Sequence, residues 1–362
     1  MAADSYANLV KDQSIDRNLK QVLTELMKTV ESPEGKTSND LLDEAEAKIF
    51  ELSTNRANAD SLKKIESYVK ETWDRLEELS GMQGELIGVS SGFTAIDGLT
   101  QGLQKEDLIV IAGRPSMGKT SLAMNIAENV AKKNEGCVAV FSLEMSSQSL
   151  TQRMLASMAG ISQSNVKSAN LTDRQWDKIA KQTKNMNDLN IFVDDTPNIS
   201  PMEIRAKSRR LAKQFRNSGG LNLVVIDYIQ LMQMPGRNEN RVNELSDISR
   251  SLKYLAKEVK APVIVLSQLN RGVEQRPNKR PQMSDLRDSG AIEQDADLIF
   301  MLYRDFIYTK NEEWKNVAEL NLVKHRNGPT KRVLLSFRDE LTRFGDLAPE
   351  IMNSYAQDRT ED

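Results

Sequence analysis

The segment "GRPSMGKT", Gly113 to Thr120, decides the fold prediction for this chain. It follows the apolar run "LIVIAG" and opens the helical stretch "SLAMNIAENVAKK", which is the setting of a Walker A phosphate loop. Its glycines let backbone N–H groups turn toward phosphates, Lys119 reaches the β- and γ-phosphates, and Thr120 holds Mg²⁺. We therefore predict that ATP and Mg²⁺ bind to Gly113, Arg114, Pro115, Ser116, Met117, Gly118, Lys119 and Thr120. The alternative is a glycine-rich turn without a ligand.

Further short apolar runs alternate with helical stretches on both sides of this loop. They are "CVAVFSL", "IFVDD", "LVVIDY", "PVIVLS" and "LIFMLY". Such runs predict a mostly parallel sheet that helices cover on both faces, an α/β fold. The last two strands, "AELNLVKH" and "RVLLSF", flank a short turn at Asn327 and Gly328, so they must be antiparallel.

Three polar residues end predicted strands. Asp227 ends "LVVID", where a Walker B aspartate would bind the Mg²⁺ shell. No acid follows it, so Glu144, after "CVAVFSL", is the candidate base for the attacking water. An ordinary cap of the next helix is the alternative for Glu144. Gln268, after "PVIVLS", could sense the γ-phosphate and pass its loss to the next loop.

That loop, "NRGVEQRPNKRPQMSDLRDSGAIEQDAD", spans residues 270–297 and is the longest irregular stretch of the chain. Its cations are Arg271, Arg276, Lys279, Arg280 and Arg287. Because it has no aromatic residue for base stacking, we predict contacts to the phosphates of a nucleic-acid backbone. A solvated surface loop is the alternative.

Two cations precede the turn in "VKHRNGP", residues 323–329. Lys324 and Arg326 are two apart on a strand and point the same way, with no acid between or beside them. The intervening His325 points to the other side. Taken alone, the two cations are either a guard against pairing at a sheet edge or are waiting for an anion.

Composition excludes several classes of function. The net charge of −3 argues against a generally basic nucleic-acid coat, so any such contact must be local. One cysteine, Cys137, excludes a disulfide framework, and one histidine excludes zinc-histidine sites and Ser-His-Asp catalysis. No apolar run is long enough for a membrane span or a signal sequence. We expect a soluble, intracellular protein.

The sequence pattern changes near residue 80 and divides the chain into two parts. Residues 1–80 carry narrow apolar stripes at helical spacing, at Leu41 to Leu52 and Leu62 to Leu79, with polar connectors between them. They form an arm that packs either on its own chain or on a neighbouring subunit. Residues 81–362 carry the phosphate loop and form the main domain.

Together the motifs resemble those of DnaB-type replicative helicases. The set is "GRPSMGKT", "FSLEM", "VVIDYIQLM", "LSQLNR", "KRPQMSDLRDSGAIEQDAD" and "VKHRNGP", and the resemblance runs from about Tyr6 to about Phe344. It implies a RecA-like ATPase fold and a homohexameric ring that uses ATP to move 5′ to 3′ along single-stranded DNA. It also implies a bacterial cytosolic setting, cellular or encoded by a phage or plasmid.

The resemblance assigns roles residue by residue. It gives Lys119 and Thr120 the phosphates and Mg²⁺, Glu144 the catalytic base, Asp227 the Mg²⁺ shell and Gln268 the γ-phosphate sensor. It places Arg287, Asp288 and Gly290 in the loop that grips DNA, although the family more often has Glu at position 288. His325 stands where Gln is usual, and we interpret it as a residue without a specific role. Lys324 and Arg326 then become cations for the γ-phosphate of the neighbouring subunit, completing its site in trans.

Family members begin with a globular helical domain, and this chain starts at what we expect to be its last helix. A helicase loader and a primase are further expected partners, and the primase role depends on that domain. Two rival functions share these motifs. One is a RecA-like recombinase or repair ATPase that forms open filaments. The other is a nucleotide-switched DNA clamp without processive unwinding.

Overall fold

The computed structural model describes residues 2–33, 35, 37, 38, 41, 45, 48, 64–81, 86–234 and 241–358, with the backbone alone at 2–12, 15, 67, 71, 75, 78–81, 287–289, 356 and 358. Contacts divide the chain into two units, residues 1–85 and 86–362. The first contains the helices α1 (Ala2–Glu31) and α3 (Glu66–Gly81). Most of the helix predicted at Leu41 to Leu52 lies outside the described residues. No helix within the described ranges is both long and apolar enough to span a membrane.

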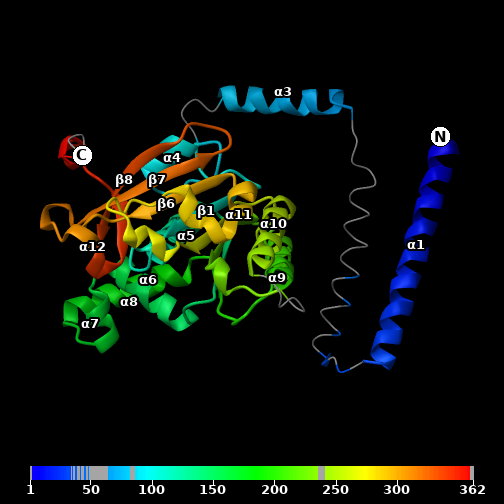
Figure 1. The fold of residues 1–362 in the computed structure, drawn as a ribbon, viewed down its shortest axis with the longest axis horizontal. Coiled ribbons are helices and arrows are strands. Elements are labelled where there is room, and N and C mark those ends of the chain that lie inside the picture. Colours follow the sequence, from blue (N-terminus) through cyan, green and yellow to red (C-terminus); the bar gives the residue numbers. More distant parts are fainter. Residues whose placement is uncertain are drawn as a thin grey trace. The chain divides into compact units, whose positions relative to one another are not determined.

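The second unit is built on one nine-stranded sheet (Figure 1). Its strands are β1 (Leu108–Gly113), β2 (Cys137–Ser142), β3 (Ile191–Asp194), β4 (Leu221–Asp227), β5 (Val263–Gln268), β6 (Leu298–Tyr303), β7 (Val317–His325), β8 (Lys331–Arg338) and β9 (Arg343–Asp346). The order is β3-β2-β4-β5-β1-β6-β7-β8-β9. Strands up to β6 pair in parallel, and β7, β8 and β9 pair antiparallel. The predicted α/β fold and its antiparallel end are therefore confirmed, and the short β9 was not predicted.

Helices of this unit fill the connections between strands. They are α4 (Thr94–Thr100), α5 (Lys119–Lys133), α6 (Ser147–Ala159), α7 (Gln163–Ser168), α8 (Asp173–Asn187), α9 (Pro201–Gln214), α10 (Arg241–Val259), α11 (Gly290–Asp295), α12 (Phe306–Thr309) and α13 (Pro349–Asp358). Figure 1 shows α6, α7 and α8 grouped together, and α9 beside α10, in agreement with their contacts.

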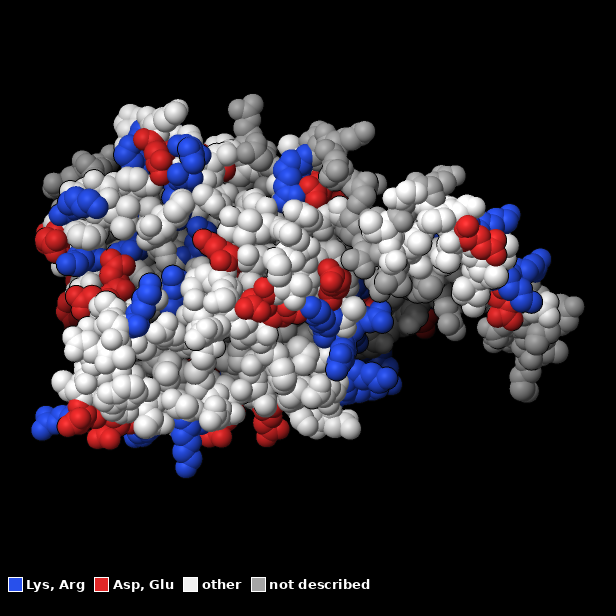
Figure 2. Space-filling view, turned by 90° about the horizontal axis from the view of Figure 1, so that it is seen from below, with Lys and Arg blue, Asp and Glu red and all other residues white. Residues whose placement is uncertain are grey.

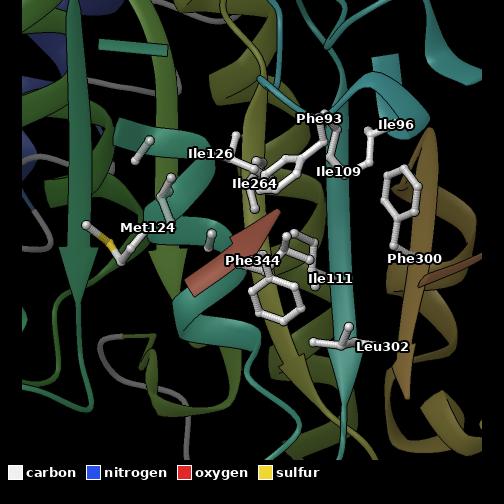
Figure 3. Packing of buried hydrophobic residues seen from close by; sticks show 14 of the residues in the cluster. Phe93, Ile96, Ile109, Ile111, Met124, Ile126, Ile264, Phe300, Leu302 and Phe344 are labelled. Carbon is white, nitrogen blue, oxygen red and sulfur yellow. The ribbon is translucent and has the colours of Figure 1, made fainter. Parts of the chain in front are cut away.

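The sheet separates two hydrophobic cores, as the unbroken apolar runs predict. Along β1, Ile109 and Ile111 join the core on the α5 side, whereas Val110 joins the core on the α10 side. Figure 3 shows the first of these cores, where the two isoleucines lie with Phe300 of β6 and Ile126 of α5. Each fully buried side chain of this size contributes roughly 1.5–3 kcal/mol. The two cores thus fix the strand ends that carry the site.

The connection from β5 to β6 is more regular than the irregular loop that we expected. It holds two 3₁₀ turns, η2 (Arg271–Gln275) and η3 (Met283–Ser289), and then α11. The reason is local: the Asp285 carboxylate accepts hydrogen bonds from the Gln282 N–H (2.7 Å) and from Arg276 (2.8 Å), which pins the start of η3. The prolines at 277 and 281 fall between these segments.

Candidate nucleotide site and nucleic-acid interface

The phosphate loop joins β1 to α5 at the carboxyl edge of the sheet. Ser116 and Gly118 adopt positive φ angles of 65° and 98°, which turn the chain into a cradle. A Cβ on Gly118 would stand 3.1 Å from the ring of Phe344, so glycine is needed for space as well as for conformation. Met117 is buried and anchors the loop in the core. Pro115 and Ser116 stay exposed at its tip.

Among the described residues, no carboxylate is in hydrogen-bond contact with the ammonium group of Lys119. Its Nζ donates to the carbonyl oxygens of Gly113 (2.8 Å) and Arg114 (3.2 Å). Burial lowers the pKa of Lys119 to about 8, against the opposing pull of Asp227 and Glu144. A buried cation held only by carbonyl groups is suited to an anionic ligand such as a phosphate.

Thr120 and Asp227 meet directly, although they are far apart in sequence. The Thr120 hydroxyl donates a 2.7 Å hydrogen bond to Asp227 Oδ2, and Asp227 is 4% exposed. Burial raises the pKa of the Asp227 carboxyl, while the Thr120 hydrogen bond opposes that rise. A hydroxyl beside a carboxylate at the foot of a phosphate cradle is an oxygen donor set that fits Mg²⁺.

A pocket of about 350 Å³ brings together the predicted nucleotide residues Lys119, Thr120, Glu144, Asp227 and Gln268. Strand pairing explains the meeting: β2 lies beside β4, with Ser142 opposite Asp227, so Glu144 follows two residues later at the same edge. Glu144 itself is exposed and precedes α6 without belonging to it. The geometry is that of a group free to act on a bound ligand.

Three residues that line the pocket were not predicted as site residues: Ser121, which directly follows the phosphate loop, Tyr228 and Arg153. Tyr228 lines the pocket and directly follows Asp227. Its position next to a Walker B aspartate could have predicted that it lies in the nucleotide site. Arg153 reaches the pocket from α6, and its buried Nε has no hydrogen-bond partner. One arginine on an amphipathic helix gave no signal, because only the packing of α6 brings it to the pocket.

Arg114 belongs to the phosphate loop, yet it does not line this pocket. Its Nε and Nη2 donate to Glu274 Oε1 (3.0 and 2.8 Å), and its Nη1 donates to the Leu269 carbonyl oxygen (2.8 Å). These contacts tie the phosphate loop to the connection that follows β5.

Lys324 and Arg326 lie at the opposite, amino edge of the sheet, because β7 runs back along β6 and His325 pairs with Leu298. The six residues of β1 separate the two edges by about 17 Å. Arg326 Nη1 lies 3.3 Å from Asp297 Oδ1, and its Nη2 donates to the Gln294 carbonyl oxygen at 2.7 Å. No acid stands beside these cations in the sequence, but the fold brings one to Arg326, because Asp297 lies in the turn into β6.

Lys324 shares these surroundings. Its Nζ donates to the carbonyl oxygens of Glu293 and Gln294 at the end of α11. Burial and then Arg326 lower the pKa of Lys324. His325 points the other way, with Nδ1 3.2 Å from the Pro329 carbonyl oxygen, as strand alternation predicts.

Most cations of the 270–297 segment are held within the chain. Arg276 pairs with Asp285 (2.8 Å), Lys279 donates to the Glu274 carbonyl oxygen (2.9 Å), and Arg280 pairs with the buried Glu319 (2.9 Å). Arg271 is exposed, and no described acid pairs with it. The side chains of Arg287 and Asp288 lie outside the described residues, and Gly290 begins α11.

One face of the molecule also carries charges of both signs. Figure 2 shows Lys and Arg interspersed with Asp and Glu on the face that it presents, without a continuous basic field. Contact with a nucleic acid through this segment would therefore rest on Arg271 and on backbone N–H groups more than on a row of free cations.

Comparison with known proteins places these features in context. Residues 88–346 match the family described as the DnaB-like helicase C terminal domain. The chain is 46% identical over 347 residues to the replicative DNA helicase DnaB of Geobacillus stearothermophilus, covering 94% of this chain and 74% of that protein. It is 45% identical to the replicative DNA helicase DnaC of Bacillus subtilis, with the same coverage.

Two solved structures are also similar. One is described as an ATPase domain, with a TM-score of 0.74 and 37% identity over 80% of this chain and all of that one. The other is described as a DnaB-like replicative helicase and its interactions with primase, with a TM-score of 0.77 and 33% identity over 95% of this chain and 79% of that one.

Proposed function

This chain belongs to the DnaB-like helicase family, and from that premise we propose that it is the ATP-hydrolysing motor of a homohexameric replicative DNA helicase. The observation that carries the proposal is the single pocket that unites Lys119, Glu144 and Asp227 at the carboxyl edge of the sheet. The ring would translocate 5′ to 3′ on single-stranded DNA and unwind the duplex at a replication fork.

Each pocket residue has a role in ATP hydrolysis. Lys119 holds the β- and γ-phosphates, and Glu144 orients the attacking water and takes its proton as the water attacks the γ-phosphate in line. Thr120 and Asp227 would hold Mg²⁺, which neutralises charge on the phosphates when bound. Gln268 reads whether the γ-phosphate is present.

Charge that develops on the γ-phosphate needs a further cation. Lys324 and Arg326 are at the far edge of their own sheet, so in this proposal they serve the pocket of the adjacent subunit. Asp297 holds Arg326 at that edge until the neighbouring pocket docks against it. Activity then requires assembly.

DNA contact is assigned to the segment that follows β5. Arg271 and the backbone around Gly290 would bind phosphates, with Arg287 and Asp288 in the same loop. Binding should be independent of sequence and should weaken with salt. Arg276, Lys279 and Arg280 shape the segment through their contacts within the chain.

Two further proposals concern partners. Residues 1–80 form an arm whose helix α3 docks on a neighbouring motor of residues 81–362. Exposed apolar side chains on α3, Val69, Trp73 and Leu76 among them, support a docking role. A primase is a candidate partner because a similar solved structure is described with one, and a loader would place the ring on DNA.

A fork-unwinding assay tests the proposal. The wild-type chain should hydrolyse ATP faster with single-stranded DNA and should open a forked duplex with a free 5′ tail, whereas Lys119→Ala should do neither. DNA-stimulated hydrolysis without unwinding under any loading condition would instead favour a nucleotide-switched clamp. Strand exchange on open filaments would favour a recombinase.

A further inference from the structure

The end of β5 lacks a strand on its β4 side. The two strands pair at Val224, Val225 and Ile226 of β4, opposite Val263, Ile264 and Val265 of β5. On its other side β5 continues along β1 as far as Gln268, opposite Gly113. The backbone groups of Gln268 that face β4 therefore need another partner, since unpaired backbone groups are costly.

The side chain of Gln230 supplies that partner. Its Nε2 donates to the Gln268 carbonyl oxygen (3.1 Å) and to Ser267 Oγ (3.0 Å). Its Oε1 accepts from the Gln268 N–H (3.2 Å). One primary amide thus contacts both backbone groups of Gln268, as a neighbouring strand would.

Gln268 occupies a position where two pockets meet. It lines the nucleotide pocket, and it also lines a second pocket of about 260 Å³. Gln230 and Arg271 line the second pocket but not the first. A displacement of the Gln268 backbone would therefore change the shape of both pockets, the one for the nucleotide and the one beside the 270–297 segment.

The backbone of Gln230 is held in place by residues at the start of α10. It lies in the 3₁₀ turn η1 (Ile229–Leu231), directly after β4. Its carbonyl oxygen accepts from Arg241 Nη2 (2.8 Å) at the start of α10, and the same nitrogen reaches the Met232 carbonyl oxygen (3.0 Å). Glu244 pairs with Arg241 and accepts from the Met234 N–H (2.8 Å). These contacts anchor the backbone of Gln230 to α10 and so fix the position of its side-chain amide.

We propose that Gln230 is a positioning residue for Gln268: its amide sets the backbone of the γ-phosphate sensor and links the sensor to the segment 228–234 and to α10. The inference rests on the proposed function, in which Gln268 senses the γ-phosphate. Gln230 does not line the nucleotide pocket, so in this proposal it acts on turnover through Gln268.

The test measures DNA-stimulated ATPase for Gln230→Ala, Gln268→Ala and the double variant. Gln230→Ala should lower kcat about tenfold, the effect of one well-placed hydrogen-bonding group, and should leave KM for ATP within about twofold. The double variant should be no slower than Gln268→Ala, because residues that act through one contact are not additive. Gln182→Ala on α8, which removes an amide bonded to Asn185, is the matched control and should match wild type.

Hydrogen exchange gives a second readout that activity does not. The Gln268 N–H should exchange at least about tenfold faster in Gln230→Ala, with the rest of β5 unchanged. Gln230→Glu keeps an acceptor for the Gln268 N–H but sets a carboxylate oxygen against the Gln268 carbonyl oxygen, so its kcat should fall at least as far as that of Gln230→Ala. It remains informative if the alanine variant folds poorly.

The outcomes separate the two claims. A Gln268→Ala variant with wild-type turnover would remove the sensor role and with it part of the proposed function. A slow Gln268→Ala beside a Gln230→Ala of normal kcat, or single effects that multiply in the double variant, would overturn the positioning role alone.

Discussion

The two edges of the central sheet differ in how their charged side chains are paired. At the carboxyl edge Lys119 bonds to carbonyl groups, and Arg153 has an unpartnered buried Nε. At the amino edge Asp297 accepts hydrogen bonds from the Leu108 N–H, Lys253 and Arg326. At the first edge Lys119 forms no ion pair with a described residue, whereas at the second Asp297 pairs with two cations of its own chain.

If Arg326 serves the adjacent subunit as proposed, this difference explains how a subunit can be stable alone and inactive alone. In the pocket the ammonium group of Lys119 hydrogen-bonds to carbonyl oxygens and not to the nearby Asp227 and Glu144, which leaves it available to a phosphate. The amino edge keeps Lys324 and Arg326 in place without a ligand, which stabilises the isolated fold. Each prediction below removes one charge from one edge and asks whether the contrast holds.

The largest effect is expected for Arg326→Ala. If Arg326 completes the neighbouring site, ATPase should fall about 10³-fold or more, as for loss of other arginines supplied in trans. Lys119→Ala should be inactive as well. Mixtures of the two variants should regain ATPase, because some interfaces then pair an intact pocket with an intact arginine.

The control for the mixing experiment is Lys331→Ala, an exposed cation at the start of β8, which should stay active. Co-assembly must be verified by size and mass measurements. Mixtures that co-assemble and remain inactive at every ratio would place both cations outside the trans site.

The next effect concerns the base at the carboxyl edge. Glu144→Gln should lower kcat at least about 10²-fold and leave nucleotide and DNA binding intact, because the amide keeps the shape but cannot accept the proton of water. Single-turnover ATP hydrolysis with separate binding titrations measures both. Near-normal turnover would reduce Glu144 to a residue that precedes α6.

A smaller effect follows from the pKa of Lys119, which burial lowers to about 8. Below that pH the free pocket already holds the ammonium form. Above it the lysine is neutral and must take up a proton when phosphate binds. Affinity for an ATP analogue should therefore fall about tenfold from pH 7 to pH 9, with proton uptake in calorimetry. Lys119→Arg should remove the uptake, and an unchanged uptake would exclude Lys119 as its source.

The smallest effect belongs to Asp107 at the amino edge. Burial first, and then Asp297, raise the pKa of Asp107 from 3.8 to about 6. The charged form is thus disfavoured in the folded state, so stability falls as pH rises through about 6. Asp107→Asn should raise the free energy of unfolding by about 1 kcal/mol at pH 8, after allowance for partial exposure, and by less at pH 5. Thermal unfolding at both pH values measures this, with Glu135→Gln as the exposed control.

Most of the fold and much of the site could be predicted from sequence. Buried parallel strands appear as unbroken apolar runs, so the predicted strands match β1 to β8 closely. The phosphate loop and Asp227 follow from position at strand ends, and the pairing of β2 with β4 brings Glu144 to them.

What could not be predicted depends on side chains that meet across the fold. Asp297 reaches Arg326 only because of the register between β6 and β7. Arg280 is paired with Glu319 of β7, which lies 39 positions further along the chain, so its charge is not available to a ligand. Arg153 needs the packing of α6. The short β9 was missed because "RFGD" has one large apolar residue, Phe344, which the core buries.

The placement of the phosphate loop and of Arg326 on opposite edges has a consequence for symmetry. A two-fold dimer pairs the same patch of both copies, so it could complete both sites at once only if the pocket and Arg326 lay on one self-complementary patch. If Arg326 instead serves a copy related head to tail, the interface is heterologous, and an open assembly leaves one unused arginine and one incomplete pocket at its two ends. In such a head-to-tail assembly, closure into a ring completes every site.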